Sequence, residues 1–197
     1  MDGMGLKSIE QYQTFLSQKL ASWTPPRPLA LAASFAERWM RAYEEFSNLE
    51  EWGDPEALRM GVETVWGHVL GQSSSASERK RLIRAIEQAS PHMDDFDAIE
   101  ALMTCVVVND ALSACADPKK TATAVWDMAT EVLENLSEEE WPEEPEEQAE
   151  FWESDLIQDE LRAQLRLIEL VEAVKSFEEL TVTELRRQAR NLVVIIR

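Results

Sequence analysis

The segment LALAASFAERWMRAYEEF, residues 29–46, indicates the fold more clearly than any other part of the chain. Its aromatic residues Phe35, Trp39, Tyr43 and Phe46 recur every three to four positions. This spacing places them on one side of an α-helix, because a helix has about 3.6 residues per turn. The segment therefore predicts a helix that buries its aromatic face in the core.

Helical patterns continue on both sides of this segment. Ser8 and Gln11 form a capping box for a helix that runs to about Trp23, and Asp54–Pro55 begins another helix that ends at Gly71. A short basic helix is predicted through Leu82, Ile83 and Ile86. The next helix starts at Asp94 or Asp95, and its apolar face is Phe96, Ile99, Leu102, Met103 and Val106. The remaining predicted helices are one from Asp117–Pro118 to Leu136, a long one from about Pro145 to Phe177, and a short one after a Thr181–Glu184 capping box.

These patterns predict an all-α protein of about seven to eight helices, arranged as a bundle or an orthogonal array. Most connections are short, and no internal repeat suggests a solenoid. We expect residues 1–197 to form a single helical domain, with an acidic loop at about 137–149 before a long C-terminal helix. The tail Leu192–Ile196 is β-prone but has no evident strand partner.

The acidity of the chain is local. The stretch between Lys120 and Arg162 holds 15 of the 38 acidic residues and none of the 19 bases of a chain whose net charge is −19. The rest of the chain is close to balanced. A local negative field attracts basic partners and repels nucleic acid and anionic membranes.

Two interpretations of the acidic stretch remain open. It is a solvated surface that keeps the protein soluble, or it is a docking surface for a basic protein. The second interpretation predicts a non-catalytic protein-binding protein, such as an inhibitor or immunity protein for a basic, nuclease-like toxin. The residues that we expect to bind the partner are Glu138, Glu139, Glu140, Trp141, Glu143, Glu144, Glu146 and Glu147.

Several short motifs are similar to those of the YjaG-like family of small acidic bacterial proteins, a domain of unknown function. They are Phe35-Ala-Glu37-Arg38 with Tyr43 and Phe46, then Trp66, and Pro91-His-Met-Asp94-Asp95-Phe96-Asp97 before an apolar helix. The resemblance covers the chain from about residue 29 to its end. It implies an all-helical fold and no assigned activity.

The chain has few groups that are typical of catalysis. It has two histidines, His68 and His92, and the residues three positions before them are Val65 and Ala89 rather than the glutamate of di-iron bundles. No zinc motif, phosphate-binding glycine loop or nucleophile elbow occurs, and there are only six glycines. We therefore expect neither an enzyme nor a bound cofactor.

The alternative function is a metal- or ligand-binding protein that uses Asp94, Asp95 and Asp97, together with His92 and Glu100. Carboxylates this close together in sequence could hold Mg²⁺ or Ca²⁺, although the glycine of a calcium loop is missing. A simpler interpretation is that these acids cap a helix and oppose its dipole. The capping interpretation accounts for each acid and predicts no metal site.

Two further features allow a structural and a functional interpretation. Glu37 and Arg38 could be a buried ion pair beside a functional pocket, or a link between neighbouring helices. Trp52 and Trp141 each lie among acids in a predicted loop, where an exposed tryptophan could anchor an interface. In contrast, Trp39, Trp66, Trp126 and Trp152 have helical spacing and are expected in the core.

The compartment is expected to be the cytoplasm. The N-terminal sequence has neither the basic segment nor the apolar stretch of a signal peptide, and no apolar run approaches the roughly 20 residues that span a bilayer. Cys105 and Cys115 are ten residues apart, about 15 Å along one helix, which is too far for a disulfide. They are therefore expected to be free, buried thiols.

Overall fold

The structure is a computed structural model that describes residues 6–92, 98–117, 120–135 and 150–192. Within these ranges the regular secondary structure is helical and contains no strand. The helices are α1 (Ile9–Ser22), α2 (Arg27–Glu50), α3 (Pro55–Val69), α4 (Ala76–Ala89), α5 (Ile99–Ala114), α6 (Thr121–Asn135), α8 (Asp155–Ala173) and α9 (Glu179–Arg190). The predicted all-α fold class is confirmed.

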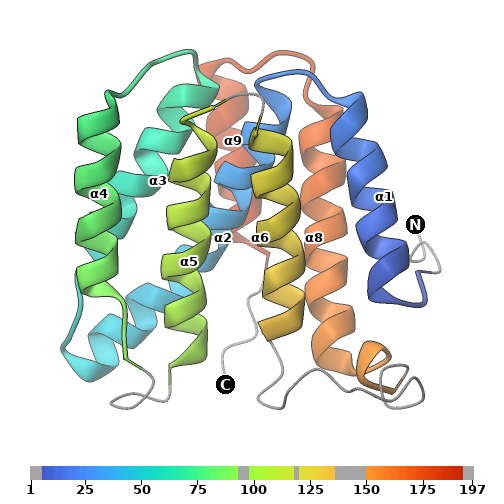
Figure 1. Cartoon of the computed structure of the whole chain (residues 1–197), viewed down its shortest axis with the longest axis horizontal. Coiled ribbons are helices and arrows are strands. Elements are labelled where there is room, and N and C mark those ends of the chain that lie inside the picture. The colour runs from blue at the N-terminus through green and yellow to red at the C-terminus, as the bar shows by residue number, and fades with distance from the viewer. Residues whose placement is uncertain (1–5, 93–97, 118–119, 136–149, 193–197) are drawn as a thin grey trace.

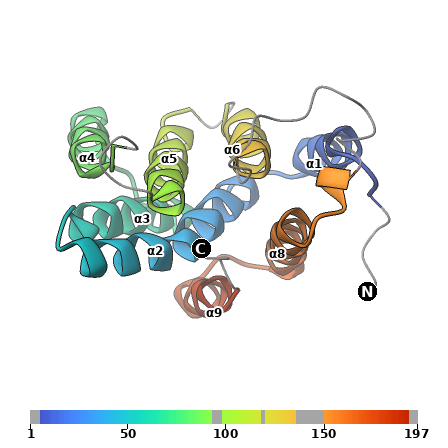
Figure 2. The same cartoon turned by 90° about the horizontal axis from the view of Figure 1, so that it is seen from below.

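The helices pack in two layers (Figures 1 and 2). One layer contains α1, α4, α5 and α6, and the other contains α2, α3, α8 and α9. The central element is α2, which contacts α3, α5, α6, α8 and α9. None of the helices in the described ranges is long and apolar enough to cross a membrane.

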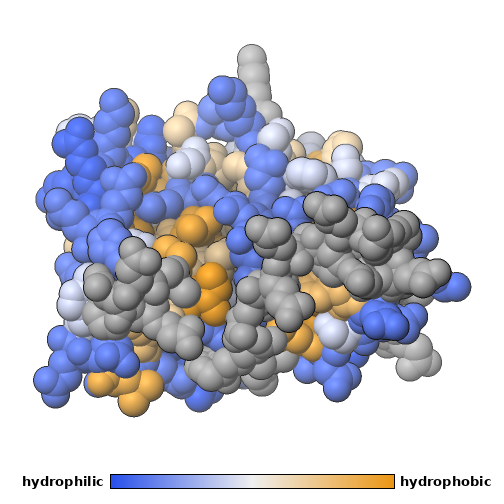
Figure 3. Space-filling view, turned by 60° about the horizontal axis from the view of Figure 1, so that its bottom comes forward, coloured by the Kyte–Doolittle hydropathy of each residue, from blue (hydrophilic) through white to orange (hydrophobic). Residues whose placement is uncertain are grey.

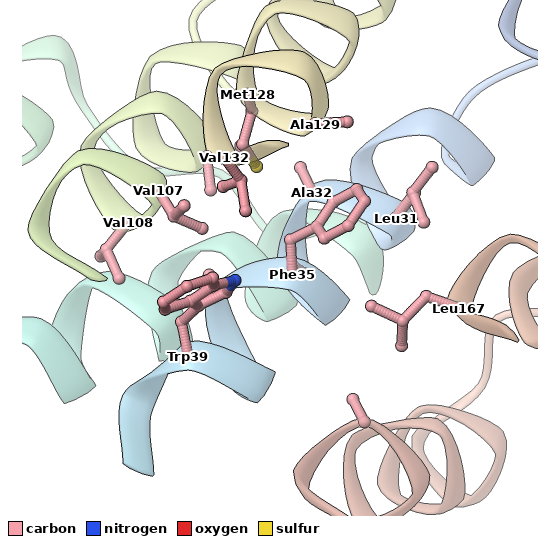
Figure 4. Packing of buried hydrophobic residues seen from close by; sticks show 14 of the residues in the cluster. Leu31, Ala32, Phe35, Trp39, Val107, Val108, Met128, Ala129, Val132 and Leu167 are labelled. Carbon is pink, nitrogen blue, oxygen red and sulfur yellow. The ribbon is translucent and has the colours of Figure 1, made fainter. Parts of the chain in front are cut away.

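The sequence of α2 explains its central position. All four predicted aromatic residues of this helix are buried, and alanines at positions 30, 32, 33 and 36 let neighbouring helices approach closely. In Figure 4 the side chains of Phe35 and Trp39 lie among residues of α5 and α6, including Val108 and Val132, while Leu167 of α8 lies on another side of α2. One hydrophobic cluster therefore joins the two layers through α2.

Several predicted helix limits are corrected. The prediction of one continuous helix from about Pro145 to Phe177 is wrong for its described part, which begins at residue 150. The chain turns at 153–154, and Ser154 caps a new helix by accepting the N–H of Ile157. The Thr181–Glu184 capping box is also wrong, because α9 already begins at Glu179.

The start of α4 lies in a serine-rich run at 73–77. Ser75 accepts the N–H of Glu78, and the Glu78 carboxylate accepts the N–H of Ser75. These two bonds form a capping box. α4 therefore starts within the serine run.

The buried face of α5 differs from the predicted one. Ile99, Leu102 and Val106 are only half-buried, whereas Val107 and Val108 are fully buried. This helix is apolar on nearly every side, so periodicity alone could not identify the face that meets α2 and α3. Its predicted start at Asp94 or Asp95 lies outside the described residues, and so do the acidic loop and most of the β-prone tail.

The two cysteines are unpaired, as predicted. Cys105 is buried in α5, and burial raises the pKa of its thiol to about 12. Cys115 is half-buried rather than buried, and burial also raises the pKa of its thiol to about 12. Both thiols are therefore protonated and poorly reactive at neutral pH.

Candidate functional site

An acidic surface forms where α5 meets α6. Asp110 of α5 is half-buried, and Asp127 and Glu131 of α6 are its charged neighbours. Burial, followed by the charges of Glu131 and Asp127, raises the pKa of Asp110 to about 6. Burial and Glu131 also raise the pKa of Glu134 on the same helix. Asp110, Asp127, Glu131 and Glu134 together form this acidic surface.

Among the described residues, no base neutralises the acidic surface. In the described part of the chain none of its four carboxylates forms an ion pair, and α5 and α6 contain no lysine or arginine. Among the described residues no group of three or more histidines, cysteines or carboxylates is placed to hold a metal ion.

The surface of α4 has the opposite charge. Lys80, Arg81 and Arg84 are exposed and line a shallow hollow of about 760 Å³ with Ser77 and Gln88. The three bases make no ion pair within the described ranges. Figure 3 shows this hydrophilic surface on the left, with hydrophobic surface toward the middle. The layer that contains α4, α5 and α6 is therefore basic at one end and acidic farther along.

A second charged cluster centres on the buried carboxylate of Glu37 in α2. Its Oε1 accepts from Arg59 Nη1 of α3 at 2.7 Å and from Arg190 Nε of α9 at 2.5 Å. Its Oε2 accepts from Trp66 Nε1 of α3 and from Arg186 Nε of α9, both at 2.9 Å. Four donors therefore satisfy this carboxylate, which has no exposed side-chain surface.

A third cluster lies between α2 and α8. Arg38 forms a two-bonded ion pair with Glu160 at 2.8 and 2.6 Å, and the exposed fractions of these side chains are 1% and 4%. Glu160 also accepts from Gln164 Nε2 at 3.0 Å, and the Tyr12 hydroxyl donates to Gln164 Oε1. Burial, followed by the Glu160 charge, raises the pKa of Tyr12 well above its usual value. These groups join α1, α2 and α8 through buried polar contacts.

The expected Glu37–Arg38 pair is therefore corrected. The two residues face different neighbours, with Glu37 toward α3 and α9 and Arg38 toward α8. Each one links helices, which agrees with the structural interpretation, but they do not pair with each other. The sequence interpretation missed Glu160, although its spacing from Leu167 and Val171 puts a carboxylate on the apolar face of α8.

One contact has the residue types of a nucleophile and a base. His68 Nε2 lies 2.7 Å from Ser74 Oγ. However, the Ser74 backbone N–H donates to the same nitrogen at 3.1 Å, and Arg79 Nη1 donates to the Ser74 carbonyl at 2.5 Å. Burial and the Arg79 charge lower the pKa of His68, which favours the neutral ring that accepts these bonds. The contact closes the loop between α3 and α4.

Several predicted site residues lie outside the described residues. They include the partner-binding set Glu138, Glu139, Glu140, Trp141, Glu143, Glu144, Glu146 and Glu147, and the cluster Asp94, Asp95 and Asp97. Trp52 is described and differs from the expectation of an exposed anchor, because it is half-buried and packs edge-on against Phe46 with ring centroids 6.0 Å apart.

The core tryptophans largely follow the prediction. Trp39, Trp66 and Trp152 are buried, whereas Trp126 is half-buried and donates from Nε1 to the Gln13 carbonyl at 3.2 Å. Asp110 was not singled out by the sequence interpretation. The signal that could have found it is an acid one helical turn after Val106, within a strongly apolar helix.

The fold and the sequence together define a family. Residues 16–194 match the model of a protein family of unknown function, DUF416, and the chain belongs to this family. The fold is similar to that in the crystal structure of a DUF416 family protein from Shewanella baltica, with a TM-score of 0.72 and 18% identity. The match covers 88% of this chain and 92% of that chain. A comparison with curated proteins finds no match.

Proposed function

We propose that this chain is a non-catalytic binding protein for a basic protein partner. The observation that carries the proposal is the acidic surface of α5 and α6, whose carboxylates have no neutralising base in the described part of the chain. Close like charges in a half-buried position disfavour ionisation, which the raised pKa of Asp110 reflects. A cationic partner would relieve the repulsion among these carboxylates, and this relief would contribute favourable electrostatic energy to binding.

The proposed partner-binding residues also include Glu138, Glu139, Glu140, Trp141, Glu143, Glu144, Glu146 and Glu147, which follow α6 in sequence and lie outside the described residues. A tryptophan with acidic neighbours in sequence matches the usual composition of protein interfaces, in which aromatic residues act as anchors. A cytoplasmic inhibitor or immunity protein for a nuclease-like toxin fits this composition, because a nuclease surface complements phosphate and is therefore basic. We also propose that the chain is a member of the YjaG-like family.

The first experiment identifies the partner. The tagged chain serves as bait in an extract of its source organism, next to a variant in which Asp110→Asn, Asp127→Asn and Glu131→Gln neutralise the acidic surface. The control bait carries Glu45→Gln, Asp159→Asn and Glu169→Gln, which remove the same number of charges from acids that already pair with a base on their own helix.

A basic protein retained by the wild type and by the control, but not by the acidic-surface variant, is the expected result. With the purified partner, stopped-flow kinetics should show association about 10-fold slower for the acidic-surface variant at low salt, and a weaker salt dependence. If the partner is a nuclease, saturating chain should suppress its cleavage of DNA or RNA. Equal effects of the two triple variants would show that only net charge matters, and would refute the proposed surface.

A further inference from the structure

The helix α9 is attached to the rest of the protein by a small apolar contact. It buries only Val182, Leu185 and Ala189, while Leu180 is 87% exposed. α9 packs mainly against α2, makes a smaller contact with α8, and lies in the layer away from α5 and α6 (Figure 2). Few apolar groups therefore hold α9 in place.

The main polar anchors of α9 are two arginines one helical turn apart. Arg186 donates from Nε to Glu37 Oε2 at 2.9 Å and from Nη1 to Glu63 Oε2 at 2.8 Å, with a further bond from Nη2 to the second Glu63 oxygen. Arg190 donates from Nε to Glu37 Oε1 at 2.5 Å. Arg186 also lies over the ring of Trp66, with 5.9 Å to the ring centroid. Glu37, Glu63 and Trp66, with the apolar surface beside them, form the α9 seat.

The α9 seat is held together by contacts that do not involve α9. Glu37 keeps the bonds from Arg59 Nη1 and Trp66 Nε1, which both come from α3, and Arg59 is itself held by Glu44 at 2.5 Å. If α9 leaves, the buried Glu37 carboxylate therefore retains a positive partner and a neutral donor, and it is not left as an isolated charge. The departure also opens one acceptor position on each Glu37 oxygen.

We propose that the α9 seat is a receptor for a basic amphipathic helix of a partner protein, with arginines at positions i and i+4 beside an apolar stripe. α9 occupies the seat as the chain's own version of this ligand, and an incoming helix displaces it. The segment VTELRRQAR, residues 182–190, states the recognition pattern: Val182, Leu185 and Ala189 face the core, and Arg186 and Arg190 meet Glu37.

Arginine is required in this pattern, because the Arg186 guanidinium bonds both Glu37 and Glu63 while it covers an aromatic ring. The neighbouring Arg187 does not belong to the pattern, because it is exposed and pairs with Glu184 within α9. The proposal goes beyond the proposed function: the α9 seat and the acidic surface lie in different layers, and either can be correct without the other.

A fluorescent synthetic peptide with the sequence of residues 178–192 tests the proposal by anisotropy. The receptor is the full chain with Arg186→Gln and Arg190→Gln, in which the competing α9 is weakened. This receptor should bind the peptide about 10-fold or more tightly than the wild-type chain does, because a larger fraction of its seats is free. A receptor with Arg187→Gln is the matched control and should behave like the wild type.

Two peptide variants test the recognition pattern. A peptide with Arg187→Gln should bind like the parent, and a peptide with Arg186→Gln and Arg190→Gln should bind at least about 10-fold more weakly, because it loses the charge-assisted bonds to Glu37. Adding Glu63→Gln to the receptor should also weaken binding, and Glu63 is half-exposed, so the fold should tolerate this change. Equal binding of all peptides, or no effect of Glu63→Gln, would overturn the proposal.

Hydrogen exchange on the wild-type chain gives an independent decision if the doubly substituted receptor does not fold. Excess parent peptide should increase amide exchange in residues 179–190, because it displaces α9. The peptide with Arg186→Gln and Arg190→Gln should leave this exchange unchanged. If amide hydrogen exchange in residues 179–190 is unchanged with the parent peptide at about 1 mM, the peptide does not displace α9 from the α9 seat, and the proposal is refuted.

Discussion

Removing Arg38 should destabilise the protein strongly. The Arg38–Glu160 pair is bonded at 2.8 and 2.6 Å, and its side chains are 1% and 4% exposed. Arg38→Met therefore leaves the Glu160 carboxylate buried with Gln164 as its remaining side-chain donor. Loss of one partner from such a pair costs about 3–5 kcal/mol. In a protein of this size the melting temperature should fall by about 6–20 °C.

The control is Arg41→Met, three residues farther along the same helix. Arg41 pairs with Glu45, but the two side chains are 74% and 39% exposed, so the loss should be at most about 0.5 kcal/mol. Urea unfolding, followed by tryptophan fluorescence and far-UV circular dichroism, measures both free energies of unfolding. The contrast between the two variants isolates the effect of burial.

The double variant Arg38→Met with Glu160→Leu tests the physical cause. If the cost of Arg38→Met arises from an isolated buried charge, replacing both partners with apolar residues should restore stability to within about 1 kcal/mol of the wild type or exceed it. Two results would refute this reasoning. One is an Arg38→Met variant as stable as Arg41→Met, and the other is a double variant no more stable than Arg38→Met alone.

Three further predictions concern the half-buried acid, a helix contact and the thiols. The pKa of Asp110 is raised in the folded protein to about 6, so the folded state binds this proton more tightly than the unfolded state does. The resulting contribution to stability is lost as pH rises from about 4 to 6. Asp110→Asn should therefore raise the free energy of unfolding at pH 7 by about 1 kcal/mol, and urea titrations should show a flatter pH dependence. Gly61→Ala should cost about 1–3 kcal/mol and lower the melting temperature, because the new Cβ would lie 2.8 Å from a side-chain carbon of α5. In the control Gly67→Ala the new Cβ would meet only a flexible glutamine side chain, so this variant should be neutral or slightly stabilising. Equal melting temperatures of the two variants would contradict the close packing of α3 on α5. Native Cys105 and Cys115 should react slowly with a thiol reagent at pH 8, and two thiols should be counted after unfolding without reductant; a count of zero would contradict the free state of both residues.

The sequence by itself determined the helices and much of the core, because these depend on residues close together in the chain. A helix forms bonds four residues apart, so its apolar spacing and its caps are local signals. The aromatic stripe of α2, the Asp54 cap of α3 and the helical fold class were predicted in this way. The buried face of α5 was not, because its apolar residues lie on nearly every side of the helix and give no local signal for the side that its neighbours cover.

Only the tertiary structure decided the partners of the buried charged groups. Arg38 and Glu160 are 122 residues apart, and Glu37 is 149 and 153 residues from the two arginines of α9. The pKa of Asp110 likewise depends on its burial and on carboxylates of a different helix. Coulomb energy and desolvation depend on distance in space and on exposure, and neither follows from spacing along the chain. The helices were therefore encoded locally. The buried ion pairs formed only when helices far apart in the sequence packed together, and the acidic surface formed only when α5 packed against α6.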